Sequence, residues 1–358
     1  MFRRFLQKLH HLLGISAGVV MFFLALSGSI LVFDEEIDRW LNPELLSIAP
    51  AEKPVSLDAA LAVVQKELPD HQVAFIRLPR TPESSVEVWS SDEPHQIAYV
   101  DPYRLKLLGT RGENDGAMGV LKDLHVRLFA GEAGHTGVGI VGLALLFLLG
   151  SGAVLAWRKG RLKRIFKPRL KGPAAAIAFD WHRFIGTAGW ALLFISAVTG
   201  VMLVFFRVTA FALMLAFGGT PPERPGPVEL APDVPLLALD EMRPRAEAAM
   251  PDATLTWMSP PEKEGAPFLG RYRHRDDPHP NGTSFAAFHP QTGELLSVYG
   301  WENKGTGLWL SDLKYPIHIG AFWGAAGPLI VVLTGVVPIA LMGTGSYLWL
   351  RRRLQARR

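Results

Sequence analysis

Histidine is the residue type of this 358-residue chain that is best placed to do chemistry. The chain has 11 histidines and no cysteine. The lack of cysteine excludes disulfides, iron–sulfur clusters held by thiolates, zinc sites built on cysteine and covalently attached c-type haem. Any metal chemistry must therefore rest on histidines, carboxylates or a bound cofactor. The sequence also contains no G-x-S-x-G, H-E-x-x-H or P-loop motif, so a hydrolase or kinase function has no support.

An internal repeat arranges four of the histidines in two pairs. The aligned ranges are 10–33 with 182–205, at an offset of 172, and 124–134 with 317–327, at an offset of 193. The matched histidines are His10 with His182 and His125 with His318. Both copies run in the same direction, which predicts a pseudo-twofold axis, and matched side chains lie close together if they face that axis.

A pair of histidines facing each other across a helix bundle is the geometry of a b-type haem with two imidazole ligands. Two such pairs predict two non-covalent b-type haems, which should transfer electrons rather than bind dioxygen because both axial positions are filled. His11, next to His10, and His135, near the end of its apolar segment, stay open as alternative ligands. The sequence singles out no further catalytic residue.

The elements that must position these histidines are membrane-spanning helices. Hydrophobic residues make up 49% of the chain and charged residues 20%, a balance typical of membrane proteins. Four segments are long and apolar enough to cross a bilayer, which takes about 20 helical residues. These segments are 12–33, 136–157, 184–206 and 315–350. The last is too long for one span, so its first part should lie at the membrane surface.

Positive charge predicts the orientation of the spans. Segments 1–11, 158–172 and 351–358 together carry 16 of the 37 lysines and arginines and no acidic residue. The positive-inside rule makes both termini and the 158–172 segment cytoplasmic, so that 34–135 and 207–314 lie on the outer side. Because these basic runs flank spans, they indicate topology and contact with anionic lipid rather than binding of nucleic acid.

Each outer segment has the pattern of a small α+β unit. In the first, a helix-like stretch at 55–70 precedes strand-like runs at 73–78, 86–90 and 97–101. In the second, a Pro-rich spacer and a helix-like stretch at 236–250 precede strand-like runs at 254–258, 268–274 and 284–290.

The motifs around the paired histidines resemble those of the PepSY-associated transmembrane family. The motifs that carry the resemblance are Leu9-His10-x-x-x-Gly14 with Ser27-Gly28, Trp181-His182-x-x-x-Gly186 with Thr199-Gly200, Leu124-His125 with Gly131, and Ile317-His318 with Gly324. The outer segments resemble PepSY-type domains, through Val100-Asp101-Pro102-Tyr103 and Gln291-Thr292-Gly293-Glu294. The first copy departs from that turn, with Arg104-Leu105 where Thr-Gly is usual.

The resemblance implies an integral membrane, mainly α fold: a bundle of four transmembrane helices from a parallel internal repeat, with two α+β PepSY-like periplasmic domains. The expected order is the N-terminus with the first span (1–33), PepSY-like domain 1 (34–123), the second span with its lead-in (124–157), a basic cytoplasmic loop (158–183), the third span (184–206), PepSY-like domain 2 (207–312), the fourth span with its lead-in (313–350) and a basic tail (351–358).

The family includes iron-regulated inner-membrane siderophore reductases that carry two haems. The resemblance therefore implies an inner-membrane oxidoreductase that passes electrons from a cytoplasmic reductant or quinol to a ferric siderophore, such as a hydroxamate, in the periplasm. Arg3, Arg4, Lys8, Arg158 and Arg183 lie near the inner histidine pair in sequence and could neutralise haem propionates.

Three alternatives stay open at this point. One is a regulatory or protease-modulating membrane protein without redox activity. Another is a transporter of the ferric chelate, although the spans lack the broken, charge-lined helices expected of one, apart from Pro328 and Pro338. The third is a cytochrome b subunit that delivers electrons to a partner protein.

Overall fold

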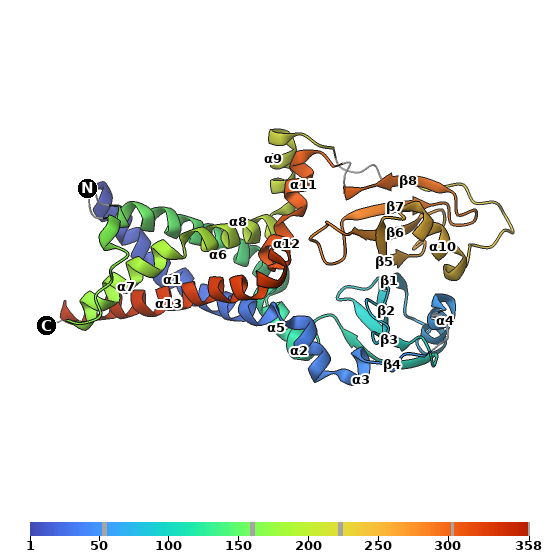
Figure 1. Cartoon of the computed structure of the whole chain (residues 1–358), viewed down its shortest axis with the longest axis horizontal. Coiled ribbons are helices and arrows are strands. Elements are labelled where there is room, and N and C mark those ends of the chain that lie inside the picture. Colours follow the sequence, from blue (N-terminus) through green and yellow to red (C-terminus); the bar gives the residue numbers. More distant parts are fainter. Residues whose placement is uncertain (52–55, 158–161, 221–224, 302–303, 357–358) are drawn as a thin grey trace. The chain divides into compact units, whose positions relative to one another are not determined.

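The computed structural model describes residues 1–51, 56–157, 162–220, 225–301 and 304–356, and it divides into two compact units (Figure 1). The helical unit comprises Met1–Phe33, Val120–Ala210 and Lys314–Arg358, and the sheet unit comprises Asp34–Gly119 and Phe211–Leu313. Each unit is described by itself.

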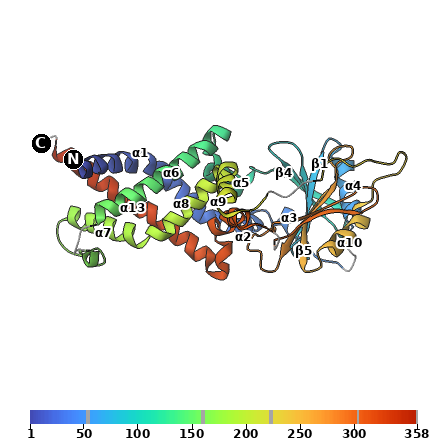
Figure 2. The ribbon, with the colours of Figure 1, turned by 90° about the horizontal axis from the view of Figure 1, so that it is seen from above.

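The helical unit is built on long apolar helices. Within the described residues, three helical stretches are long and apolar enough to cross a membrane, and a bent pair of helices makes a fourth if it counts as one span. The three contain α1 (Phe2–Leu31), α6 (Gly131–Ala156) and α13 (Gly327–Gln355). Helix α1 packs against both α6 and α13 (Figure 2).

The third predicted span differs from the uninterrupted segment 184–206. The chain forms α7 (Ala174–Ala188) and α8 (Trp190–Val204), which meet at an angle of 61°. Gly189 occupies the break, and a Cβ atom there would lie 2.7 Å from Cγ1 of Val337 on α13. The bend therefore brings the backbone directly against α13, at a point where only glycine fits without a shift of the neighbouring side chain.

Short helices precede and follow the spans. Helix α5 (Gly116–Arg127) leads into α6, and α12 (Lys314–His318) with a 3₁₀ turn, η3 (Ala321–Ala326), leads into α13. The start of the 315–350 run thus lies before the long helix, as its length predicts. Beyond α8 the apolar run continues as a separate helix, α9 (Phe206–Phe217), which the sequence did not predict. A 3₁₀ turn, η1 (Leu162–Arg164), lies between α6 and α7.

In the part of the sheet unit that the structure describes, eight strands form one antiparallel sheet in the order β4-β3-β2-β1-β5-β6-β7-β8. The strands are β1 (Val73–Arg77), β2 (Val86–Ser90), β3 (Gln96–Asp101), β4 (Lys106–Gly112), β5 (Ala253–Ser259), β6 (Phe268–His274), β7 (Ser284–Phe288) and β8 (Leu295–Tyr299). The helices are α2 (Asp34–Leu41), α3 (Pro43–Leu46), α4 (Leu57–Glu67), α10 (Leu239–Ala249) and α11 (Thr306–Asp312).

Segments 34–135 and 207–314 share this sheet. Strand β1 of the first segment pairs with β5 of the second, with Ile76 opposite Met258 and Arg77 opposite Trp257. The N–H of Leu78 extends the pairing by donating to the carbonyl of Thr256 over 3.0 Å. The segments therefore form one continuous layer.

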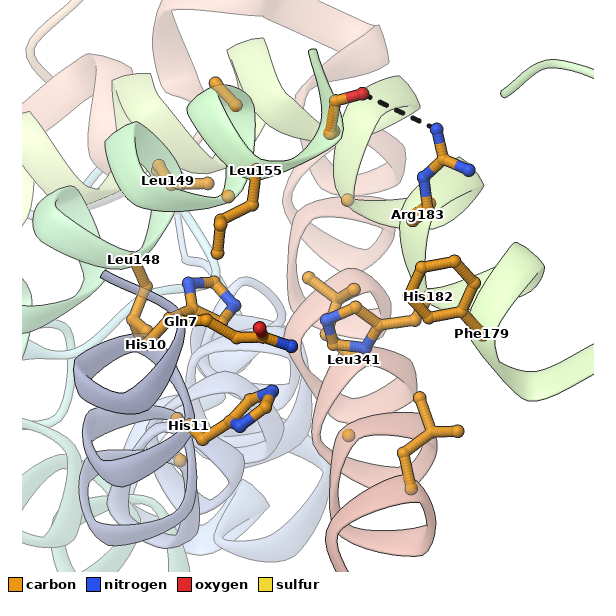
Figure 3. Close-up of a pocket in the computed structure, with 18 of the residues that line it drawn as sticks. Gln7, His10, His11, Leu148, Leu149, Leu155, Phe179, His182, Arg183 and Leu341 are labelled. Carbon is orange, nitrogen blue, oxygen red and sulfur yellow. Dashed lines mark hydrogen bonds between the residues drawn. The ribbon is translucent and has the colours of Figure 1, made fainter. Parts of the chain in front are cut away.

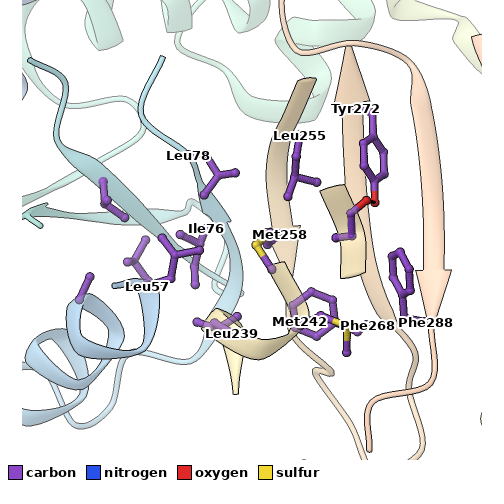
Figure 4. Packing of buried hydrophobic residues seen from close by; sticks show 14 of the residues in the cluster. Leu57, Ile76, Leu78, Leu239, Met242, Leu255, Met258, Phe268, Tyr272 and Phe288 are labelled. Carbon is purple, nitrogen blue, oxygen red and sulfur yellow. Dashed lines mark hydrogen bonds between the residues drawn. The ribbon is translucent and has the colours of Figure 1, made fainter. Parts of the chain in front are cut away.

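Successive side chains of a strand point to opposite faces of the sheet. The side chains on one face, together with two helices, form the core of the sheet unit (Figure 4). Helices α4 and α10 supply Leu57 and Met242 to it, and the strands supply Met258, Phe268 and Tyr272, all buried. The buried hydroxyl of Tyr272 donates to the carbonyl of Ala246 on α10, so the apolar layer leaves this polar atom satisfied.

Candidate functional site

His125 and His318 come together in the helical unit. They lie on α5 and α12, and their ring centroids are 6.3 Å apart with the ring planes tilted by 51°. Two imidazoles that bind one metal through Nε2, with metal–nitrogen bonds of about 2.0–2.1 Å, place their centroids about 6 Å apart. The observed separation is therefore one at which both rings can reach a single metal ion.

A hydroxyl group contacts Nδ1 of each of these rings. Nδ1 of His125 lies 3.0 Å from Oγ of Ser27 on α1, and Nδ1 of His318 lies 3.0 Å from Oγ1 of Thr199 on α8. Ser27 and Thr199 are the residues that the offset of 172 matches with each other. The two histidines thus have equivalent partners on equivalent helices.

His10 and His182 have the same kind of partner. Nδ1 of His10, on α1, lies 2.7 Å from Oγ of Ser151 on α6. Nδ1 of His182, on α7, lies 2.9 Å from Oγ1 of Thr344 on α13. Ser151 and Thr344 differ by 193 positions, the offset that also relates His125 to His318.

A glycine follows each of the four hydroxyl residues, and each glycine lies beside Cε1 of the same histidine. A Cβ atom at Gly28 would lie 2.8 Å from Cε1 of His125, and one at Gly200 would lie 3.2 Å from Cε1 of His318. At Gly152 and Gly345 the distance to Cε1 of His10 and His182, respectively, would be 3.4 Å. We call each Ser-Gly or Thr-Gly pair a hydroxyl–glycine cradle: the hydroxyl contacts Nδ1, and the missing side chain leaves room for the ring.

The pair His10 and His182 lines a cavity of about 630 Å³ between α1, α6, α7 and α13. Figure 3 shows the two rings facing each other across it. This volume lies within the range of ligand pockets, about 300–1,000 Å³. Glycines on all four helices contribute to its wall, namely Gly14, Gly18, Gly152, Gly186 and Gly345.

Cationic side chains surround the same cavity. Arg3, Arg4, Arg183 and Arg352 line it. Arg3 donates to the carbonyl of Leu155 over 2.9 Å, and Arg183 donates to the carbonyl of Ala156 over 3.5 Å, so both reach the end of α6. Of the other basic residues singled out from the sequence, Lys8 is outside the cavity lining, and Arg158 lies outside the described residues.

The sequence matches the family model of the PepSY-associated TM region over residues 7–352. The chain belongs to this family. A search of the curated proteins finds no match. The family and the apolar helices together make the chain a multi-pass membrane protein with an attached α+β sheet unit.

The alternative ligands differ from the four paired histidines of this PepSY-associated transmembrane protein. His11 lines the cavity beside His10, and its Nε2 lies 3.4 Å from a guanidinium nitrogen of Arg352. His135 lies in the first turns of α6. Among the described residues, neither histidine has a hydroxyl partner for Nδ1.

Each histidine pair offers two protein ligands. Among the residues that the structure describes, no group of three or more His, Asp or Glu side chains is arranged to hold a metal ion. A metal bound between two imidazoles would need its other ligands from a non-protein group, and a porphyrin supplies four in one plane. The ring separation at His125 and His318 and the cavity between His10 and His182 fit such a group.

Sequence reasoning missed the role of the hydroxyl residues. Ser27 and Thr199 entered only as parts of the motifs that resemble the family, and Ser151 and Thr344 were not singled out at all. The signal that could have found them is a Ser-Gly or Thr-Gly dipeptide at four places, related by the same two offsets as the histidines.

Proposed function

We propose that this PepSY-associated transmembrane protein is a ferric-siderophore reductase of the bacterial inner membrane that holds two b-type haems. The observation that carries the proposal is the matched environment of four histidines in two pairs, each with a hydroxyl at Nδ1 and a glycine beside the ring. A regulatory protein without a cofactor has no need for four such environments.

His10 and His182 would hold one haem, and His125 and His318 the other. When bound, each haem would supply reversible one-electron transfer. His10 and Ser27, the partner of His125, lie on the same helix, 17 residues apart, or about 25 Å along the helix axis. Since the hydrocarbon core is about 30 Å thick, the two pairs would serve opposite sides of the membrane.

The arginines around the first pair suit the carboxylates of a haem. Arg3 and Arg183 each donate to a carbonyl at the end of α6, which holds their guanidinium groups at the mouth of the cavity. A guanidinium forms charge-assisted hydrogen bonds with carboxylates, often two at a time. These residues would therefore bind and orient the propionates, in addition to marking the cytoplasmic side.

The remaining parts of the proposal concern orientation and substrate. Both termini would be cytoplasmic, with a cytoplasmic reductant or quinol as the donor, and the four helices would form a parallel repeat. The sheet unit would be periplasmic, with two PepSY-like halves, and would bind the ferric siderophore. Reduction to Fe(II) weakens the hold of hard oxygen ligands such as hydroxamates, because the metal charge falls.

The test is a visible spectrum of the detergent-purified protein, oxidised and reduced with dithionite, with haem counted per chain. We expect two haems. The variants His10→Ala and His182→Ala should lose the same one, and His125→Ala and His318→Ala should lose the other. The control is His135→Ala, which should keep both. A colourless protein purified from cells with ample haem would contradict the proposal.

A second measurement separates reduction from haem binding. The reduced protein in liposomes is mixed with a ferric hydroxamate and an Fe(II) indicator. Reoxidation of the haems with stoichiometric Fe(II) formation supports a reductase. Two haems that stay reduced in the presence of the chelate would instead make the chain a cytochrome b for a partner protein.

A further inference from the structure

We propose that Ser27, Ser151, Thr199 and Thr344 are positioning residues that fix the four histidines in the tautomer with the proton on Nδ1. Nε2 is then the nitrogen whose lone pair is free. The claim about the tautomer concerns the protein alone, and its consequence for a bound haem rests on the proposed function.

The hydroxyl groups of three of these residues donate their protons to backbone carbonyls of their own helices. Thr199 donates to the carbonyl of Ile195 over 2.8 Å, Thr344 to that of Ala340 over 2.8 Å, and Ser27 to that of Phe23 over 2.7 Å. Bonding to the carbonyl four residues earlier is the usual choice of Ser and Thr inside helices. A hydroxyl has one proton, so toward the imidazole each of these oxygens is an acceptor. Nδ1 must then be the donor.

Ser151 makes the same contact with a different carbonyl. Its Oγ donates to the carbonyl of Leu148, three residues earlier, over 3.2 Å, while Nδ1 of His10 approaches to 2.7 Å. The single hydroxyl proton of Ser151 is therefore also donated to the backbone, and Nδ1 of His10 is the donor to its oxygen.

A second carbonyl lies near three of the hydroxyls. Oγ of Ser27 is 3.2 Å from the carbonyl of Leu24, and Oγ1 of Thr199 and Thr344 are 3.1 and 3.2 Å from the carbonyls of Ser196 and Leu341, respectively. A carbonyl can only accept, so each of these hydroxyl protons has two acceptors on the backbone of its own helix. The hydroxyl oxygen is therefore left to accept from Nδ1.

The cradles also fix the direction of each ring. Every histidine reaches across to a neighbouring helix: from α1 to α6, from α5 to α1, from α7 to α13 and from α12 to α8. The glycine beside Cε1 limits rotation of the ring on one side. Hydrogen bonding at one imidazole nitrogen fixes the tautomer and orientation of a metal ligand and raises its basicity.

The choice of a hydroxyl has a consequence for redox chemistry. A hydroxyl acceptor is neutral, so it leaves the imidazole neutral, whereas a carboxylate partner would increase its basicity further and stabilise ferric iron more. Removing the hydroxyl should make the ligand less basic still. The reduction potential of that haem should rise, with 59 mV for each tenfold change in the equilibrium constant of a one-electron couple. Haem affinity should fall by about 10–100-fold.

The first experiment needs no haem. The full-length protein, labelled with ¹⁵N-histidine and purified from a haem-deficient host, is studied in lipid by magic-angle-spinning NMR, which distinguishes Nδ1–H from Nε2–H tautomers. We expect four Nδ1–H signals. In Ser27→Ala and Thr199→Val, one signal each should change, and Ser27→Thr and Thr199→Ser should restore it. An Nε2–H tautomer at these histidines would overturn the inference, whether or not the protein binds haem.

The second experiment uses the haem-loaded protein. Potentiometric titration of Thr199→Val should show one haem with a raised potential, and Thr199→Ser should return it to the wild-type value. The matched control is Thr334→Val, because Thr334 on α13 donates to the carbonyl of Ile330 over 2.7 Å and contacts no histidine among the described residues. Unchanged potentials and affinity in Thr199→Val would overturn the positioning role. Nδ1–H tautomers in a protein that binds no haem would uphold the tautomer assignment and contradict only the proposed function.

Discussion

Asp58 and Asp240 each cap the helix to which the other belongs. The carboxylate of Asp58, on α4, accepts the N–H groups of Leu239 and Asp240 at the start of α10, both over 2.8 Å. The carboxylate of Asp240 accepts the N–H of Leu57 at the start of α4 over 2.8 Å and the hydroxyl of Ser56 over 2.6 Å. The first N–H groups of a helix lack partners within it, and negative charge is favourable there. The exchange therefore joins the two helices that cover the core.

Removing either carboxylate should destabilise the sheet unit. Asp58→Ala and Asp240→Ala should each lower the free energy of unfolding by about 1–2 kcal/mol, the cost of a lost helix cap. The double variant should lose less than the sum, because both caps support one contact between helices. Urea unfolding of the full chain in detergent measures this, with Asp252→Ala at an exposed position as the control. Single variants as stable as the control would contradict the capping role.

The stability of the sheet unit should depend on pH through Asp240. Burial opposes its ionisation, but hydrogen bonds from Ser56 and the backbone N–H of Leu57 outweigh burial and lower the pKa of Asp240 below its ordinary value of 3.8. A carboxyl whose pKa is lower in the folded state stabilises the fold above its unfolded pKa and loses that contribution as pH falls through the folded value. Urea midpoints should therefore drop below about pH 3.8, and Asp240→Asn should drop less. A variant with the same slope as the wild type would show that another group is responsible.

The cradle glycines should tolerate a methyl group unequally. Gly28→Ala places Cβ 2.8 Å from Cε1 of His125, so the ring must move, at a cost of about 1–3 kcal/mol. Gly200→Ala, at 3.2 Å from His318, should have a smaller effect. Gly150→Ala is the control, since no atom lies within 4 Å of its Cβ position. Thermal stability and haem count per chain should fall in the order control, Gly200→Ala, Gly28→Ala, and equal values for all three would refute the fit.

Hydropathy predicted where the long helices lie but not how one of them bends. The apolar run through Gly189 is as continuous in composition as the other spans, and it nevertheless breaks there. The reason is a tertiary contact with Val337, more than 140 positions later in the chain, which no local pattern records. Helix α9 was missed because the predicted span ends at Phe206, before the charge of Arg207, which is the second residue of that helix.

Alternating side chains predicted six of the eight strands found among the described residues, to within two residues of their observed ends. The two that were missed, β4 and β8, are the edge strands, and β4 contains Gly109 and Gly112, which are unfavourable in strands. The pairing of β1 with β5 could not be predicted from the sequence either. Ile76 and Met258 lie opposite each other although they are far apart in the chain, and no local pattern records such a contact.

The repeat brought the histidines into pairs on sequence grounds, and the structure places His125 beside His318 and faces His10 toward His182. The hydroxyl partners could not be deduced in the same way. Ser151 is spaced 141 positions from His10, so their contact depends on which face of α6 meets α1. Only packing decides that.

The contact between β1 and β5 also sets an order of events during synthesis. About 175 residues separate Arg77, at the end of β1, from Ala253, at the start of β5. A ribosome adding about 5–20 residues per second takes roughly 10–35 s to make them. For most of that interval, after β2, β3 and β4 have been made, the edge of β1 that later pairs with β5 keeps its N–H and C=O groups unpaired, and such an edge attracts other chains. The unpaired edge of this four-stranded half-sheet must therefore be kept from pairing with other chains while the next membrane helices are still being inserted.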